Sequence, residues 1–183
     1  MEYSELEQNI KKALQILIEK DKYLFINDLS ERSIVHRLAL YINEIFQDFG
    51  YNVDCEYNGL PNESRKRKYL KVLIDDLINL NLLTDREKAL IEQGNLPQDG
   101  NLQKLVFPDV IIHKRGETVN NLAIIECKKS SNNSSNERKY DKLKLIHYQN
   151  SEFLNYQYGI FIDFIVGENP NFKIQKIERN NQV

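Results

Sequence analysis

Two apolar runs joined by a short polar segment constrain the fold of this chain most strongly. Both lie in FPDVIIHKRGETVNNLAIIECKK, which covers residues 107–129. The joining segment KRGETVNN contains the residue types that favour turns. We therefore predict strands at 106–113 and 121–128 that pair as an antiparallel hairpin.

The register of this hairpin decides which side chains share a face. If the turn centres between residues 117 and 118, Ile111 lies opposite Ile124 and Asp109 lies opposite Glu126. Directly opposed residues on antiparallel strands have Cβ atoms about 4.5 to 5.5 Å apart. A slip of one residue would move Asp109 to the other face of the sheet, so the predicted cluster depends on this register.

Because side chains alternate between the two faces of a strand, a lysine of the second strand is predicted to lie on the same face as the two acids. Lys128 faces the same way as Glu126, whereas Cys127 faces the other way and is predicted to lie in the core. Two carboxylates about 4 Å apart repel by roughly 4 kcal/mol at an effective dielectric near 20, so a cation is needed between them. Mg2+ suits such oxygen ligands, and Lys128 could then act on a metal-bound water or a phosphate. The alternative is a solvated hairpin face with incidental charges.

The same residues carry a family resemblance. Pro108-Asp109 followed by Glu126-Cys127-Lys128 resembles the PD-(D/E)xK nuclease superfamily, whose fold many restriction endonucleases share. The resemblance implies that Asp109 and Glu126 bind Mg2+, for which Mn2+ can substitute, and that Lys128 assists the attacking water. It also implies an auxiliary acid on a preceding helix, here Glu31. The alternative role of Glu31 is helix capping in a D-x-x-E box.

The rest of the chain fits an α/β or α+β fold built as one domain over residues 1–183. Apolar spacing predicts helices at 5–26, from about 30 to 49, and at 136–154. Alternation predicts further strands at 51–58, 158–167 and 172–179. We therefore expect a restriction endonuclease-like mixed central sheet flanked by helices, with a helical insertion.

The insertion covers about residues 61–105. ESRKRKYLKVLIDDLINLNLL has the apolar spacing of one helix, and TDREKALIEQG predicts a second, with Thr84 and Glu87 as a capping box. It would serve as a lid or as a platform for a partner protein or a second copy of the chain. The sequence leaves this role open.

The net charge of the whole chain does not favour binding to nucleic acid, because the formal net charge is -2 and the pI is near 6.0. Contacts with phosphates would have to come from local basic groups. The candidates are Arg65, Lys66, Arg67, Lys68, Lys129 and Lys142. The competing interpretation is that these residues form solvated faces. Asp141 and Lys144 on the helix at 136–154 could reach the site, but a solvated helix face is the favoured prediction for them. For His113 and His147 we expect surface positions.

Cellular location follows from what the sequence contains. Two cysteines, Cys55 and Cys127, form neither a disulfide framework nor a zinc motif. The polar start MEYSELEQ differs from a signal peptide, and no apolar run reaches the ~18 residues that span a bilayer. We expect a cytoplasmic protein with no membrane contact.

Together these features predict a Mg2+-dependent nuclease of the PD-(D/E)xK type that cuts nucleic acid, with DNA as the favoured substrate. Restriction, repair and anti-phage defence would all suit such an enzyme. The alternative is a catalytically silent module of the same fold that binds nucleic acid or a protein partner.

Overall fold

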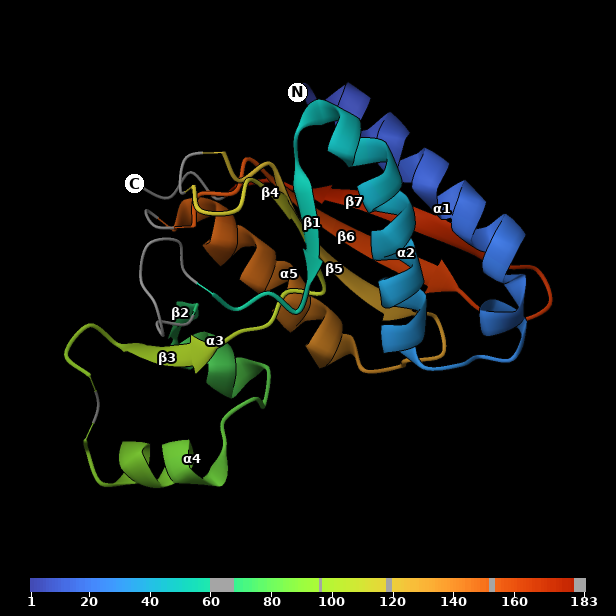
Figure 1. The fold of residues 1–183 in the computed structure, drawn as a ribbon. Coiled ribbons are helices and arrows are strands. Elements are labelled where there is room, and N and C mark those ends of the chain that lie inside the picture. The colour runs from blue at the N-terminus through green and yellow to red at the C-terminus, as the bar shows by residue number, and fades with distance from the viewer. Residues whose placement is uncertain (60–67, 96, 118–119, 152–153, 180–183) are drawn as a thin grey trace.

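The computed structural model describes residues 1–59, 68–95, 97–117, 120–151 and 154–179. The helices and strands follow one another along the chain as shown in Figure 1. Their bounds are α1 (Tyr3–Ile26), α2 (Glu31–Phe46), the short 3-10 helix η1 (Gln47–Phe49), β1 (Asn52–Cys55), β2 (Tyr69–Leu73), α3 (Ile74–Asn79), α4 (Asp85–Glu92), β3 (Asn101–Leu105), β4 (Val110–His113), β5 (Ala123–Lys129), α5 (Ser135–Asn150), β6 (Tyr158–Ile165) and β7 (Asn171–Ile177).

A mixed five-stranded sheet forms the centre of the fold. Its strand order is β1-β4-β5-β6-β7, and all neighbours are antiparallel except β5 and β6, which run parallel. Parallel neighbours need a crossover connection, and α5 supplies it. The predicted mixed α+β class is therefore confirmed.

The register of the central hairpin matches the sequence prediction. Ile111 pairs with Ile124, and Val110 pairs with Ile125. Continuing this register places Asp109 level with Glu126. Strand β4 is shorter than predicted, because it starts at Val110 and leaves Asp109 in a bend just before it.

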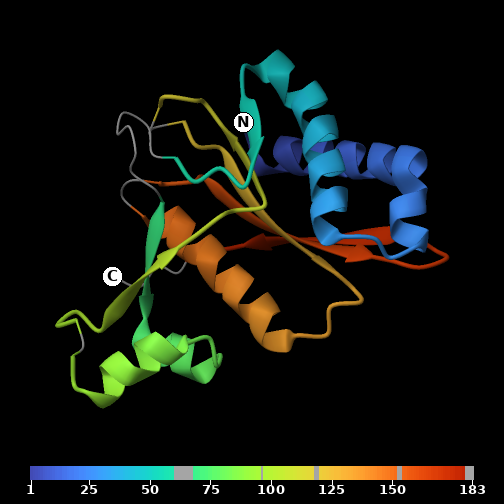
Figure 2. The same cartoon turned by 60° about the horizontal axis from the view of Figure 1, so that its bottom comes forward.

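Helices cover both faces of this sheet, as Figure 2 shows. One face packs against α1 and α2 and includes Cys127, which is fully buried as predicted. The other face carries Ile124 and Phe161 and packs against Leu145 and Tyr148 of α5. Residues of β5 therefore alternate between two cores, and Glu126 and Lys128 point toward the α5 side.

The predicted helices at the N-terminus are confirmed with small shifts of their ends. The buried residues of α1 include Leu6, Ile10 and Leu17, which follow the predicted helical spacing. Gly50 ends the η1 turn in the left-handed region, at a φ of 74°, a conformation that glycine adopts without steric cost.

The insertion differs from the predicted pair of helices. Residues Tyr69–Leu73, expected within a long helix, form strand β2, which pairs antiparallel with β3. Leu70 and Val72 are buried against α5, while the residues on either side of them are exposed. The two helices that do form, α3 and α4, are short. The predicted capping box is confirmed, since the Glu87 N–H donates to Thr84 Oγ1 and the Thr84 N–H donates to Glu87 Oε2.

No helix in the described part of the chain is both long enough and apolar enough to cross a bilayer.

Candidate active site

Asp109 reaches from the start of β4 to the backbone of β5. Its Oδ2 accepts a hydrogen bond from the Cys127 N–H at 2.7 Å, which fixes the carboxylate next to Glu126. Burial raises the pKa of Asp109 to about 6, although this hydrogen bond and the nearby lysines oppose the shift. The carboxyl group therefore titrates close to neutral pH in the absence of an added cation.

Glu126 is the most deeply buried acid of the cluster, with 2% of its surface exposed. Burial raises its pKa well above the usual range, and the charge of Asp109 adds to the shift. Lys144 Nζ lies 3.0 Å from Glu126 Oε1. This ion pair occupies Oε1, so another cation that binds Glu126 has to compete with Lys144.

Lys128 lies between two acids from different helices. Its Nζ is 3.0 Å from Asp141 Oδ2 of α5 and 3.3 Å from Glu31 Oε1 of α2. Burial would lower the pKa of Lys128, but the carboxylates of Asp141 and Glu31 outweigh it and raise the pKa. The lysine is therefore charged and held in place at neutral pH.

Glu31 faces the end of β5. Its Oε2 accepts a hydrogen bond from the Lys129 N–H at 2.8 Å, while Oε1 contacts Lys128. The cap residue of α2, Ser30, makes no side-chain capping bond. Asp28 receives hydrogen bonds from Lys129 and Ser131, which leaves the predicted D-x-x-E box unformed.

Two residues of α5, Asp141 and Lys144, join the cluster, although a solvated helix face was the favoured prediction for both. Asp141 is 5% exposed and bridges Lys128 and Lys144, whose Nζ lies 2.8 Å from Asp141 Oδ1. The favoured prediction was therefore wrong for both, since the Lys144 side chain is only 12% exposed. Asp141 lies on the buried stripe of α5 with Leu145 and Tyr148, four and seven residues further on.

The arrangement has an excess of negative charge. Glu31, Asp109, Glu126 and Asp141 outnumber Lys128 and Lys144, so the formal charge is -2 when all six ionise. Within the described ranges, no three His, Cys, Asp or Glu side chains are grouped so as to hold a metal ion. Asp109 lies near enough to Glu126 for its charge to raise the pKa of Glu126. One or two carboxylates with several waters is a usual Mg2+ environment, so this donor set is of the kind that Mg2+ takes, although Lys144 Nζ contacts Glu126 Oε1.

The candidate phosphate contacts are mostly engaged within the protein. Lys68 is 3% exposed, and its Nζ donates to Tyr156 Oη at 3.0 Å, which leaves almost no surface for an external phosphate. Lys129 Nζ donates to Asp28 Oδ1 and to Leu29 O, each at 2.7 Å. Lys142 Nζ lies 5.0 Å from the centre of the Phe161 ring. Arg65, Lys66 and Arg67 lie outside the described residues.

The prediction that His113 is exposed was wrong. His113 is buried, and its Nε2 lies 2.8 Å from Asp54 Oδ2 on the neighbouring strand β1. Burial lowers the pKa of His113 despite this carboxylate. Arg115 also binds Asp54, so the three residues stabilise the pairing of β1 with β4.

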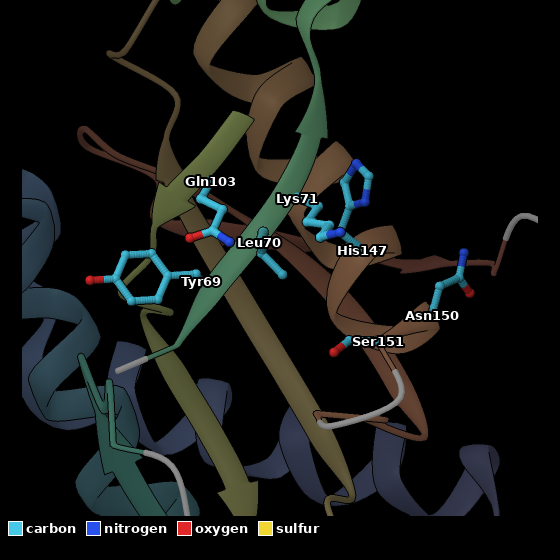
Figure 3. A pocket seen from close by; sticks show the side chains of 7 residues that line it. All are labelled: Tyr69, Leu70, Lys71, Gln103, His147, Asn150 and Ser151. Carbon is cyan, nitrogen blue, oxygen red and sulfur yellow. The ribbon is translucent and has the colours of Figure 1, made fainter. Parts of the chain in front are cut away.

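One cavity borders β2, and another borders the segment just before β4. The larger, of 460 Å³, lies between β2 and the end of α5 and contains no residue of the acidic cluster; Figure 3 shows its lining residues Tyr69, Leu70, Lys71, Gln103, His147, Asn150 and Ser151. His147 is partly buried there, and burial lowers its pKa. The smaller cavity, of 370 Å³, is lined by Glu31 and Asp109 and therefore opens onto the cluster.

The fold and site define a mixed α+β protein with a buried cluster of acids and lysines at one end of its central hairpin. Comparisons with protein-family models, curated proteins and solved structures gave no match for this chain.

Proposed function

We propose that this protein is a metal-dependent nuclease of the PD-(D/E)xK type that hydrolyses phosphodiester bonds in nucleic acid, with DNA as the favoured substrate. One observation carries the proposal. The predicted motif residues Asp109, Glu126 and Lys128 lie together at the end of the β4–β5 hairpin, in the predicted register. Glu31, the fourth residue of the resemblance, contacts Lys128.

The chemistry follows from the roles of these side chains. Asp109 and Glu126 would hold Mg2+, which would supply Lewis-acid activation of water and charge stabilisation at the phosphate. Lys128 stays protonated between Asp141 and Glu31, so it can orient the attacking water or stabilise negative charge on the phosphate as that charge develops. Glu31 positions Lys128 and the end of β5.

Cleavage assays with the full chain test this function. With Mg2+ or Mn2+ and plasmid or single-stranded DNA, we expect cleavage that chelation abolishes. Lys128→Ala should reduce the rate by about 100-fold or more, the scale of a charge-stabilising group in an active site. Lys139→Ala is the matched control, because Lys139 is an exposed lysine of α5. Equal rates for the wild type and Lys128→Ala would overturn the mechanism.

The contact between Lys144 and Glu126 favours a second candidate function. A lysine already neutralises one proposed metal ligand, as expected of a catalytically silent module that keeps the fold for binding. Calorimetric titration with Mn2+ separates the two functions. Binding that Asp109→Asn abolishes supports the nuclease, whereas the absence of binding in the wild type supports the silent module.

A further inference from the structure

The smaller cavity has the position and the volume of a substrate pocket. Its volume of 370 Å³ falls within the range of pockets that bind small organic groups, about 300 to 1,000 Å³. It shares Glu31 and Asp109 with the candidate active site, so any group bound there lies next to the proposed metal ligands. Its lining residues are Glu31, Arg32, Val35, Glu56, Phe107 and Asp109.

Phe107 supplies an accessible aromatic surface in this wall. The residue is 48% exposed although it stands only two positions before Asp109, and it is not part of either buried core. An exposed aromatic ring beside a nuclease-like site offers a face on which a nucleobase can stack. Such stacking is tolerant of sequence, because every base has a π-face.

Arg32 supplies a positive group at the rim of the same cavity. Its side chain is 85% exposed, and its Nε lies 3.1 Å from Glu56 Oε1. Exposed ion pairs of this kind contribute little stability, so exchange of Glu56 for a phosphate costs little. The guanidinium group can bind phosphate oxygens through two parallel hydrogen bonds.

The backbone that forms the cavity wall is constrained. Glu56 adopts a φ of 47°, an uncommon conformation for a residue with a side chain. Its N–H donates to Pro108 O at 3.0 Å, which ties the end of β1 to the segment that carries Phe107 and Asp109. Residues in such conformations cluster at functional sites, where the surrounding structure holds them. The wall formed by Glu56, Phe107 and Asp109 is therefore held by this backbone hydrogen bond before any ligand binds.

We propose that this pocket binds an unpaired nucleotide of the substrate. Phe107 stacks on the base and Arg32 binds the adjacent phosphate, which brings a neighbouring phosphodiester to Asp109. A base inside a duplex is paired and stacked, so it cannot enter such a pocket unless it leaves the helix. The inference rests on the proposed nuclease function and narrows its substrate to single-stranded or locally unpaired nucleic acid.

Fluorescence anisotropy tests the pocket without cleavage. Labelled oligonucleotides are titrated with the full chain in EDTA, as single-stranded DNA, single-stranded RNA and duplex DNA of one sequence. We expect single strands to bind more tightly than the duplex. Phe107→Ala should weaken single-strand binding by about tenfold, within the range found for loss of one stacked base, and Phe107→Tyr should restore it. Comparison of the DNA and RNA strands shows which sugar the pocket accepts.

Arg32→Gln gives an independent measurement. Loss of one phosphate contact should reduce the slope of log affinity against log salt by about 0.7 for a single strand. Tyr23→Ala is the control, because Tyr23 is an exposed aromatic residue of α1 outside the cavity. Equal single-strand binding by the wild type and Phe107→Ala, or tighter binding of the duplex than of single strands, would contradict the proposed nucleotide pocket. If binding depends on Phe107 but no metal-dependent cleavage is found, the proposed nucleotide pocket stands and the proposed nuclease activity is contradicted.

Discussion

Lys144 Nζ lies 3.0 Å from Glu126 Oε1, although Lys144 comes from α5 and Glu126 from the centre of the sheet. Burial would lower the pKa of Lys144, but Glu126 and Asp141 outweigh it and raise the pKa. The ammonium group therefore stays charged and neutralises an acid that we propose as a metal ligand. A divalent cation at Glu126 would have to compete with this lysine.

Replacement of Lys144 tests this competition. Lys144→Met keeps most of the side-chain volume and removes the charge. We expect Mn2+ to bind at least tenfold more tightly by calorimetry, because the competing cation is gone. In EDTA the free energy of unfolding should fall by about 3 kcal/mol, since a buried acid loses its partner. Added Mn2+ should recover this loss in a thermal or urea unfolding experiment.

Lys139→Met, an exposed change on the same helix, should alter neither metal affinity nor stability appreciably. Weaker Mn2+ binding by Lys144→Met would show that Lys144 supports the ion site rather than competing with it.

Asp109 should make stability and metal binding depend on pH. Its pKa is about 6 in the folded protein against an ordinary value of 3.8, so the folded state holds the proton more tightly than the unfolded state. The stabilising contribution of this group is therefore fully present below pH ~4, and it is lost as the pH rises through ~6. Asp109→Asn should therefore raise the free energy of unfolding by about 3 kcal/mol at pH 8, but it should leave the free energy of unfolding unchanged at pH 4.

Urea unfolding of both proteins across this pH range measures the effect, with Asp48→Asn as the control at an exposed position. Metal affinity of the wild type should also fall as the pH drops below ~6, because protons then compete for Asp109. A stability difference that is independent of pH would reject the assigned cause.

The hairpin and its register could be predicted from the sequence because they depend on local features. A polar turn between two apolar runs fixes the pairing of Ile111 with Ile124, and alternation then places Cys127 in the core. The main helices were predictable for the same reason. Their apolar spacing is a property of each segment alone.

The features that were missed depend on partners far along the chain. Residues 69–73 satisfy both helical and strand spacing, and only pairing with residues 101–105 selects the strand. The positions of Asp141 and Lys144 depend on how α5 lies across the sheet, so their contacts with Lys128 and Glu126 could not be derived from spacing. Burial of Lys68 likewise comes from its packing beside Tyr57 and Tyr156.

Lys68 should destabilise the fold at neutral pH. Burial lowers its pKa to about 8 from an ordinary value of 10.5, so the unfolded state binds the proton more tightly between these values. Stability should therefore rise as the pH increases from ~8 to ~10. Lys68→Met should raise the free energy of unfolding by about 2 kcal/mol at pH 7, after the loss of the hydrogen bond to Tyr156.

Urea unfolding at pH 7 and at pH ~10 checks this effect, and the gain should shrink at the higher pH. Lys71→Met on the same strand is the control, because the Lys71 side chain is 66% exposed. A loss of stability at pH 7 for Lys68→Met would mean that contacts of the ammonium group with Tyr57 and Tyr156 outweigh the cost of its burial.

Gly159 allows α5 to approach the sheet closely. An added Cβ there would contact the Gln149 side-chain amide and lie 3.3 Å from Leu145 Cβ. Gln149 has little freedom to move, since its Nε2 donates to Leu145 O at 3.1 Å and to Ile177 O at 3.0 Å. Gly159→Ala should therefore lower the free energy of unfolding by about 2 kcal/mol, as overpacking of a core does.

The comparison that isolates this contact is a double-mutant cycle with Gln149→Ala, measured by urea unfolding. Truncation of Gln149 removes the atoms that the new methyl group would meet, but it also leaves Ile177 O without its hydrogen bond. Gln149→Ala alone should thus destabilise the protein, and Gly159→Ala should cost much less in that background than in the wild type. Strictly additive effects would mean that the helix shifts as a whole to accept the methyl group. In that case Lys144 and Asp141, which α5 also carries, would move relative to Glu126 and Lys128, and Mn2+ affinity would change with them.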